Sequence, residues 1–358
     1  MLRRNLLVRL AARLEGPQTL GRGRFFWLTA FAVLAAAIGY PLIVDAYTVG
    51  NTVYFFNWTF MALGLCLIWG YGGALSFGQV AFFGASGYAY GVITINFGAD
   101  YGLTLWATLA AVAISAAAAA VLGYFLFFGR ISGVFLGIVT LAVALVLERF
   151  MAQTAGPEWH IGVARLNGFN GMSGMPNLTL PWPGGDPLVL APDLPLYYVV
   201  LGLLVVVYLA LRILVNSSFG NVVVAIRENP ERATMLGYDV RKYQLGVFVI
   251  GSALAGLSGV LYTTWGQYIT PSSMGLTAAS LPIVWVAVGG RSDLTTTLIG
   301  TLLLIGGFQA LTIYGSQYAL VFMGALLVLT VLLAPQGLVM AVFSLPRVLA
   351  ARRKRSAA

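Results

Sequence analysis

Residues able to carry out acid–base, nucleophilic or metal chemistry are scarce in this sequence of 358 residues. There is one histidine, His160, and one cysteine, Cys66, which lies within an apolar run. A catalytic triad or a metal site cannot be assembled around a single histidine and a single cysteine. The two lysines, Lys242 and Lys354, each follow an arginine, so the chain has no Gly-Lys-Ser/Thr loop for ATP. We therefore expect no catalytic residue, no metal and no cofactor in this chain.

The polar residues in the most unusual setting are Ser76 and Gln79, within the stretch IWGYGGALSFGQVAFFGASGYAYG from residue 68 to 91. Seven of these 24 residues are glycine, although most of the others are apolar. Each glycine inside a helix costs about 1 kcal/mol relative to alanine, so we predict a break in the helical backbone here. A serine hydroxyl and a neutral amide at such a break would offer hydrogen bonds to a small polar molecule without holding it by charge.

The overall composition indicates the setting of this stretch. Hydrophobic residues make up 59% of the chain and charged residues 9%, whereas about 25% of a typical soluble domain is charged. Twenty basic and eleven acidic side chains are too few to cover a soluble fold of this size. The composition therefore predicts an integral membrane protein.

A helix needs about 20 predominantly apolar residues to cross the bilayer. Runs of this kind predict an all-α, polytopic transmembrane helical bundle with about ten spans. The first run is too long for the apolar region of a signal peptide, which has about 7–15 residues, so we expect a retained first helix. The predicted spans cover residues 25–44, 52–69, 72–95, 103–128, 132–152, 194–214, 243–265, 276–290, 294–314 and 317–334.

Arginine and lysine are distributed unevenly between the predicted loops, which sets the orientation. With the N-terminus in the cytoplasm, 18 of the 20 basic residues lie on the cytoplasmic side, and Arg149 and Arg165 are the exceptions. We expect both termini in the cytoplasm, with a basic N-terminal tail (1–24), a transmembrane permease domain (25–340) and a basic C-terminal tail (341–358). Because the tails adjoin membrane spans, we expect them to contact anionic membrane lipid and no nucleic acid.

The sequence offers no visible energy source for active transport. Proton-driven transporters usually carry carboxylates within their spans, whereas the eleven acidic residues here lie nearly all in predicted loops or at helix ends. Glu148 comes closest to the interior of a span, and its neighbour Arg149 favours an ion pair at a helix end. A transporter without an energy source of its own needs a separate ATPase as its motor. The alternative is a stand-alone channel or secondary transporter.

The longest basic connection between predicted spans runs from Asn216 to Gln244. Asn229-Pro230-Glu231 has the residues favoured at a helix start, and Gly237 suits a helix end. We predict a short cytoplasmic helix, Pro230–Leu236, followed by Asp239 as the cap of the next span. Such a helix would insert into a groove of a partner ATPase, and the alternative is a solvated connector. The residues predicted to carry the ATPase contact are Arg227, Glu228, Glu231, Arg232 and Gly237.

The segment AIRENPERATMLGYDVRKYQLGVFVIGSALAGLSGVLY, residues 225–262, resembles the permease subunits of ABC importers for branched-chain amino acids, of the LivM type. The similar permeases of urea importers, of the UrtC type, share this pattern. Further matches follow in order along residues 60–340: the glycine-rich stretch, SGVFLGIVTLAVAL (132–145), NGFNGMSGMP (167–176) and LAPQGLVM (333–340).

The resemblance implies a subunit of a larger assembly in the bacterial inner (plasma) membrane. Its expected partners are a second permease subunit, two cytosolic ABC ATPase subunits that use the ATP, and an extracytoplasmic solute-binding protein. Broken helices often meet the substrate inside a transporter, although close helix packing is the alternative role for these glycines. The residues predicted to line the translocation path are Ser76, Gly78, Gln79, Gly72 and Gly73.

Two departures from the family pattern leave the substrate open. The segment LPIVWVAVGGRSDL, residues 281–294, is closer to the urea type than to the amino-acid type, and the loop from Gly156 to Arg165 is longer than usual. Branched-chain amino acids are the first expectation, and urea or a short-chain amide is the alternative.

The glycine- and proline-rich segment from Gln153 to Asp193 lies outside the cytoplasm in this topology. It is either a disordered linker or a docking site for a soluble binding protein. Deletion of Trp182–Gly185 would distinguish the two interpretations.

Overall fold

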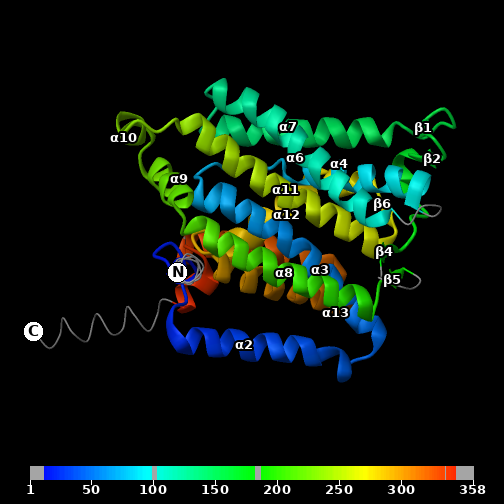
Figure 1. The fold of residues 1–358 in the computed structure, drawn as a ribbon, viewed down its shortest axis with the longest axis horizontal. Helices are drawn as coiled ribbons and strands as arrows, with labels where there is room; N and C mark the ends of the chain where they lie inside the picture. Colours follow the sequence, from blue (N-terminus) through cyan, green and yellow to red (C-terminus); the bar gives the residue numbers. More distant parts are fainter. Residues whose placement is uncertain (1–11, 99–102, 182–186, 335, 344–358) are drawn as a thin grey trace, which may run out of the picture.

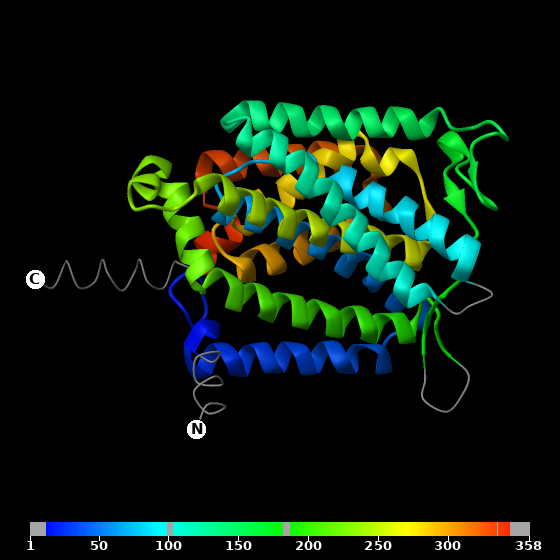
Figure 2. The same ribbon diagram turned by 45° about the horizontal axis from the view of Figure 1, so that its top comes forward.

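The computed structural model describes residues 12–98, 103–181, 187–334 and 336–343. Within these ranges the chain is a bundle of long helices, with short strands gathered at one end (Figures 1 and 2). Six-residue and five-residue π-helical turns, Cys66–Tyr71 and Thr94–Gly98, continue α3 and α4. The helices are α2 (Gly23–Gly39), α3 (Ala46–Leu65), α4 (Gln79–Ile93), α6 (Thr104–Phe128), α7 (Gly133–Ala152), α8 (Leu194–Val215), α9 (Ser218–Glu228), α10 (Pro230–Met235), α11 (Val240–Gly266), α12 (Leu276–Gly289) and α13 (Leu294–Leu333).

The two ends of the bundle differ in structure. The short helices α9 and α10 lie at one end, on the left of Figure 1, and the strands lie at the other. We call these the α10 end and the strand end. The strands form antiparallel pairs. They are β1 (His160–Ile161) with β2 (Ala164–Arg165), β3 (Met172–Ser173) with β6 (Tyr268–Ile269), and β4 (Leu178–Leu180) with β5 (Leu188–Leu190).

The described part of the segment from Gln153 to Asp193 is folded, because these strand pairs hold it against the bundle. Its apolar residues Met172, Leu178 and Leu190 are at most 4% exposed. A disordered linker is therefore the wrong description of this part, whereas docking of a binding protein stays a prediction. Trp182–Gly185 lies outside the described residues.

The helical architecture matches the predicted bundle. Among the described residues, eight helices are long and apolar enough to cross a membrane. The helices at the predicted eighth and tenth spans are shorter, Leu276–Gly289 and Tyr318–Thr330. Ten spans with both termini inside therefore stays a prediction, and a helical polytopic membrane protein is what the fold supports.

The start predicted for the third span is wrong. The sequence pattern placed that span at 72–95, but α4 begins at Gln79 and its helical backbone continues to Gly98. Residues 72–78 are not helical. The predicted helix break is therefore present, and it lies between α3 and α4.

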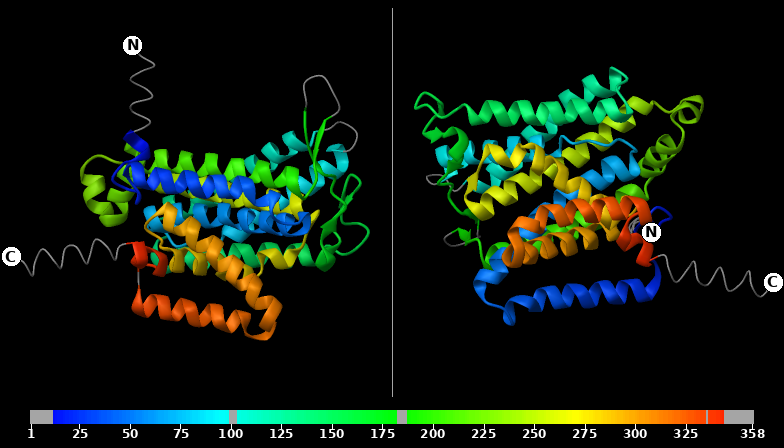
Figure 3. Two further views of the ribbon diagram at one scale, coloured as in Figure 1. Left: turned by 90° about the horizontal axis from the view of Figure 1, so that it is seen from below. Right: turned by 180° about the vertical axis from the view of Figure 1, so that it is seen from behind.

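The last two predicted spans form one helical run with an interruption. Gly315 has φ −166° and ψ 61°, which are not helical angles, and it divides α13 into two halves. Figure 3 (left) shows the two halves in orange and red, with the second half at the edge of the molecule.

Helix α11 lies at the centre, in contact with α3, α4 and α6. Small residues allow this close packing, because a Cβ atom at Gly251 would lie 2.6 Å from the carbonyl oxygen of Gly64 on α3. The hydroxyl of Ser86 on α4 donates to the carbonyl oxygen of Gly256 at 2.7 Å. Gly259 of α11 likewise lies directly against the backbone of Phe83 on α4.

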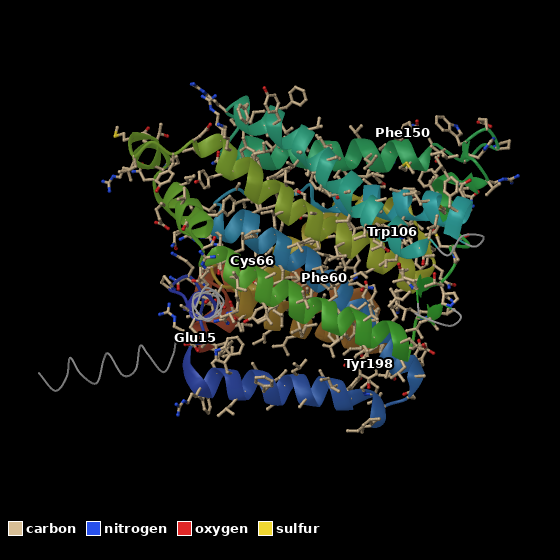
Figure 4. The ribbon with its side chains drawn as sticks, in the orientation of Figure 1. Glu15, Phe60, Cys66, Trp106, Phe150 and Tyr198 are labelled. Carbon is tan, nitrogen blue, oxygen red and sulfur yellow. The ribbon has the colours of Figure 1, made fainter. Side chains whose placement is uncertain are left out.

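Apolar side chains occur both inside the bundle and on its outer surface. Phe60 and Cys66 on α3 are fully buried, whereas Trp106 and Phe150 are 64% and 50% exposed (Figure 4). No residue of α2 is buried, and this helix lies at the edge of the bundle (Figure 1). An apolar outer surface of this kind suits a lipid environment.

Candidate functional site

Side-chain hydroxyl groups accept hydrogen bonds from the backbone of the helix break between α3 and α4. The backbone N–H of Phe77 donates to the hydroxyl of Thr140 on α7 at 3.2 Å. The N–H of Gly78 donates to the hydroxyl of Ser76, also at 3.2 Å. Non-helical backbone inside a membrane protein has to find such partners in the protein or in water. These bonds therefore fix the path of the chain through the break.

The break runs from an exposed residue, Gly73, through the partly exposed Ala74 and Leu75 to the buried Ser76 and Gly78. A Cβ atom at Gly78 would lie 3.0 Å from Thr140, which is seven residues, or about 10 Å, from the start of α7. A Cβ atom at Gly72 would lie 3.2 Å from the side chain of Val247, seven residues into α11. The break therefore sits about two helical turns inside the α10 end.

Ser76 and Gln79 are fully buried, at 0% and 1% exposure. Their place along a translocation path therefore stays a prediction. Neither the amide oxygen nor the amide nitrogen of Gln79 has a hydrogen-bond partner. Leaving buried polar groups unpaired costs about 1–3 kcal/mol each. Gln79 is therefore a side chain with unused hydrogen-bonding capacity next to the break.

Aromatic rings surround the next turn of α4, a feature that the sequence analysis missed. Phe83 follows Gln79 by one helical turn and stacks on Trp58 of α3, with ring centroids 4.8 Å apart. Trp58 also lies 5.5 Å from Tyr262 and 5.6 Å from Trp285. The indole nitrogen of Trp58 is buried without a partner. These four rings, which we call the aromatic cluster, come from four helices, so only the fold brings them together.

The predicted cytoplasmic helix is present as α10, one residue shorter than expected at its C-terminal end. The side chain of Asn229 accepts a hydrogen bond from the N–H of Arg232 at 2.9 Å, which confirms the predicted cap. Gly237 has φ +88°, and the N–H of Tyr238 donates to the carbonyl oxygen of Ala233 at 3.2 Å. This left-handed ending is the one that glycine favours.

The cap predicted for the next helix differs from the expectation. Asp239 occupies the capping position of α11, but its carboxylate makes no capping bond to the backbone. It pairs with Lys242 at 3.2 Å instead. The hydrogen bond from Lys242 lowers the pKa of this exposed carboxyl.

Helix α10 presents both charge and apolar surface to the outside. Glu231, Arg232 and Gly237 are exposed, as the docking prediction requires. Met235 and Leu236 are 85% and 77% exposed, and the sequence analysis did not select them. Two large apolar side chains beside a capped helix form the kind of surface that a protein groove covers.

Arg227 differs from the other predicted docking residues because it points toward the bundle. One guanidinium nitrogen donates to the backbone carbonyl of Gly70 at 2.6 Å. Another pairs with the carboxylate of Glu228, whose side chain is 68% exposed. Arg227 thus joins the α10 end to the turn that leads into the break.

Arg212, a charged residue within the predicted span 194–214, is buried on α8. It is 0% exposed and donates to the carbonyl oxygens of Leu14 and Gly21 at 3.0 and 2.8 Å. Its guanidinium also lies 4.8 Å from the ring of Phe26. The N-terminal residues from Leu14 to Gly21, which we call the N-terminal segment, are therefore bound to the bundle.

Asp293 holds the same segment from α13. Its carboxylate accepts from the N–H of Leu20 at 2.6 Å and from the N–H of Thr295 at 2.9 Å. Burial raises the pKa of this carboxyl, while its backbone hydrogen bonds act in the opposite direction. Both charged residues are isolated in sequence from the N-terminal segment, so no local pattern predicted their contact with it.

Metal chemistry finds no support in the part of the chain that the structure describes. No group of three or more His, Cys, Asp or Glu side chains there could hold a metal ion.

Glu148 and Arg149 lie near the end of α7, with 3.7 Å between the carboxylate and the guanidinium group, as the sequence pattern indicated.

Comparison with known proteins gives a consistent result along most of the chain. Residues 47–331 match the family described as branched-chain amino acid transport system, permease component. The chain is 26% identical over 326 residues to the high-affinity branched-chain amino acid transport system permease protein LivM of Escherichia coli, covering 86% of this chain and 73% of that protein. No solved structure gives a significant match.

Shorter matches include both permease types of one organism. The chain is 28% identical over 156 residues to a probable branched-chain amino acid transport permease protein LivM of Methanocaldococcus jannaschii, covering 40% of this chain and 45% of that protein. It is 32% identical over 153 residues to the probable LivH permease of the same organism, covering 39% and 46%.

Proposed function

This chain belongs to the family of branched-chain amino acid transport system permease components, and from this we propose that it is the membrane-spanning permease subunit of an ABC importer. In this proposal it provides the translocation path for branched-chain amino acids. Separate cytosolic ATPase subunits supply the energy, since the sequence contains no Gly-Lys-Ser/Thr loop.

The observation that carries the proposal is the capped helix α10. It is compact, it lies at the end of the bundle that the charge pattern assigns to the cytoplasm, and it exposes Met235 and Leu236. Helix-in-groove recognition uses apolar anchors of this kind. We assign α10 to the contact with an ATPase, with Glu231, Arg232 and Gly237 at its surface.

The helix break supports the assignment of a translocation path. Gly72, Gly73 and Gly78 provide non-helical backbone inside the bundle, and Gln79 adds an amide without a partner. A neutral amide can bind the charged ends of an amino acid without trapping it. Ser76 and Gln79 are buried in this structure, so we propose that they become accessible when the subunits move.

The proposed partners follow from the two ends of the bundle and from the relatives. Because LivM and LivH relatives both match this chain, we propose a heterodimer with a second permease subunit. Two ATPases would bind at the α10 end, and an extracytoplasmic solute-binding protein at the strand end. The assembly would sit among the lipids of the bacterial inner membrane.

Urea or a short-chain amide is the second candidate substrate. The segment Trp285–Arg291, WVAVGGR, resembles the urea type of permease, and Trp285 belongs to the aromatic cluster. If urea is the substrate, we expect the specificity to come from the residues that line the path and from the binding protein.

The decisive experiment is ATP-dependent uptake by proteoliposomes that contain the full complex. We expect uptake of leucine that requires ATP and the binding protein, and co-purification of this chain with an ATPase. Uptake of urea in place of leucine would favour the second candidate. Uptake without ATP, by this chain purified without an ATPase, would show a stand-alone channel or secondary transporter.

A further inference from the structure

We propose that Arg227 is a positioning residue that couples movement of α10 to the helix break, through its hydrogen bond to the carbonyl of Gly70. This inference rests on the proposed function, since it assumes that an ATPase moves α10. Arg227 itself does not touch the substrate.

Helices α9 and α10 are joined so that they move together. A single residue, Asn229, separates them, and its N–H donates to the carbonyl oxygen of Ala225 at 3.0 Å. Ala233 of α10 packs in a small apolar cluster with Val222 and Ile226 of α9. A force applied to α10 therefore reaches Arg227, which lies on the last turn of α9.

Arg227 grips the backbone at the entry to the break. The bond from its guanidinium to the carbonyl of Gly70 is 2.6 Å long, and hydrogen bonds from a charged donor are stronger than neutral ones. Its side chain also packs on Gly73, where a Cβ atom would lie 2.8 Å from the Arg227 Cγ atom. Both contacts fall within four residues of chain leading from α3 into the break.

The other side of this turn is held by the connection between α12 and α13. A Cβ atom at Gly70 would overlap the carbonyl oxygen of Arg291. The thiol of Cys66 donates to that same carbonyl at 3.4 Å. The turn at Gly70 thus has Arg227 on one side and Arg291 on the other. Because there is no gap beside Arg291, we infer that a shift of Arg227 moves the backbone of the turn.

The apolar packing next to the bond is incomplete. A cavity of about 10 Å³, enough for about one water molecule, separates the break from α9 and α11. Gly72 and Ala74 of the break line one side, and Val223 and Ile226 of α9 line the other. The bond of Arg227 therefore adds a directional link between α9 and the break at a place where their apolar packing leaves a small gap.

The test uses the complete complex in proteoliposomes, with Arg227→Met to remove the bond and Arg227→Lys to keep one charged donor. The matched control is Arg241→Met, which removes an arginine at the same end that lies over Phe128. We expect Arg227→Met to retain ATP hydrolysis but to transport about tenfold less leucine per ATP. Arg227→Lys should give an intermediate value, and Arg241→Met should equal the wild type.

A second readout reports movement of the break itself. The variant Ala74→Cys places a thiol on the partly exposed part of the break, while the native Cys66 is fully buried and gives little background. We expect a nonhydrolysable ATP analogue to change the rate of maleimide labelling at Ala74→Cys about fivefold. Combining this variant with Arg227→Met should abolish the change, and combining it with Arg241→Met should not.

The outcomes separate this inference from the proposed function. If the wild-type complex fails to couple ATP to uptake, the proposed function is wrong. If the wild type couples and Arg227→Met keeps both its transport per ATP and its labelling change, the positioning role is overturned. Loss of assembly in both Arg227→Met and Arg227→Lys would also overturn it, because the bond would then be a folding contact.

Discussion

At the scale of single residues, Gln79 and Ser76 have different roles in the structure. The hydroxyl of Ser76 accepts a backbone hydrogen bond within the break, so its first effect is on the path of the chain. Gln79 is 1% exposed, and its side-chain amide makes no hydrogen bond to its neighbours. A buried polar group without a partner calls for an explanation, and a role in the proposed translocation path is the one that we test.

Replacing Gln79 by leucine tests that function. Gln79→Leu keeps the approximate size of the side chain and removes two unpaired polar groups, so thermal stability should stay equal or rise by about 1 kcal/mol. Leucine uptake should fall about tenfold, because the path loses its amide. Thermal unfolding in detergent and uptake by the complex measure the two effects. Unchanged uptake would leave Gln79 without a role in the path.

Arg212 is the residue whose loss should most affect stability. Arg212→Met removes the hydrogen bonds to the carbonyl oxygens of Leu14 and Gly21 and a positive charge that favours the ionised form of the buried Asp293. Loss of one member of a buried charged network costs about 3 kcal/mol. We expect faster proteolysis within the N-terminal segment and a lower unfolding temperature. The exposed Arg232→Met serves as the control, and equal proteolysis of the two variants would contradict the prediction.

At the scale of elements, local signals predicted well and distant contacts did not. The start and end of α10 follow from Asn229 and Gly237, whose capping roles act within a few residues. The break follows from the glycines between residues 70 and 78. Two features join residues that are far apart in the chain: the aromatic cluster, and the hydrogen bonds of Arg212 to the N-terminal segment. Spacing in the sequence therefore could not predict them.

The same difference between local signals and long-range contacts applies to the candidate site residues. The sequence selected Arg227 as a docking residue because it lies in a basic loop, but its direction depends on how α9 packs against the turn at Gly70. Met235 and Leu236 were overlooked because apolar residues on a short helix are usually buried. Their exposure follows from the position of α10 beyond the end of the bundle.

The surface of α10 gives a prediction for the ATPase contact. The double variant Met235→Ser with Leu236→Ser removes most of the exposed apolar area of the helix, and each large apolar side chain contributes about 2 kcal/mol when buried. Affinity for the ATPase should therefore fall at least about tenfold. Thr234→Ser, on the same exposed helix, should bind like the wild type. Co-purification of the ATPase measures the effect, and equal recovery from all three would exclude docking through these side chains.

At the scale of the whole molecule, the ends of the bundle carry different charge. Arginines at the α10 end include Arg130, Arg227, Arg232, Arg241 and Arg291, whereas the strand end carries Arg165 on β2 and Arg149 near the end of α7. Positive charge collects on the cytoplasmic side of membrane proteins. The fold thus brings the arginine-rich loops together at one end of the bundle, the end that contains α10 and the N-terminal segment.

Cysteine labelling on intact cells would measure this orientation. Thr234→Cys lies on the exposed face of α10, and Asn170→Cys lies on an exposed turn at the strand end. Because the distribution of positive charge predicts that the α10 end is in the cytoplasm, a membrane-impermeant maleimide should label Asn170→Cys on intact cells. It should label Thr234→Cys only after the membrane is opened. The unaltered chain is the control, since its single cysteine, Cys66, is fully buried. Labelling in the opposite order would invert the topology and remove α10 from reach of a cytosolic ATPase.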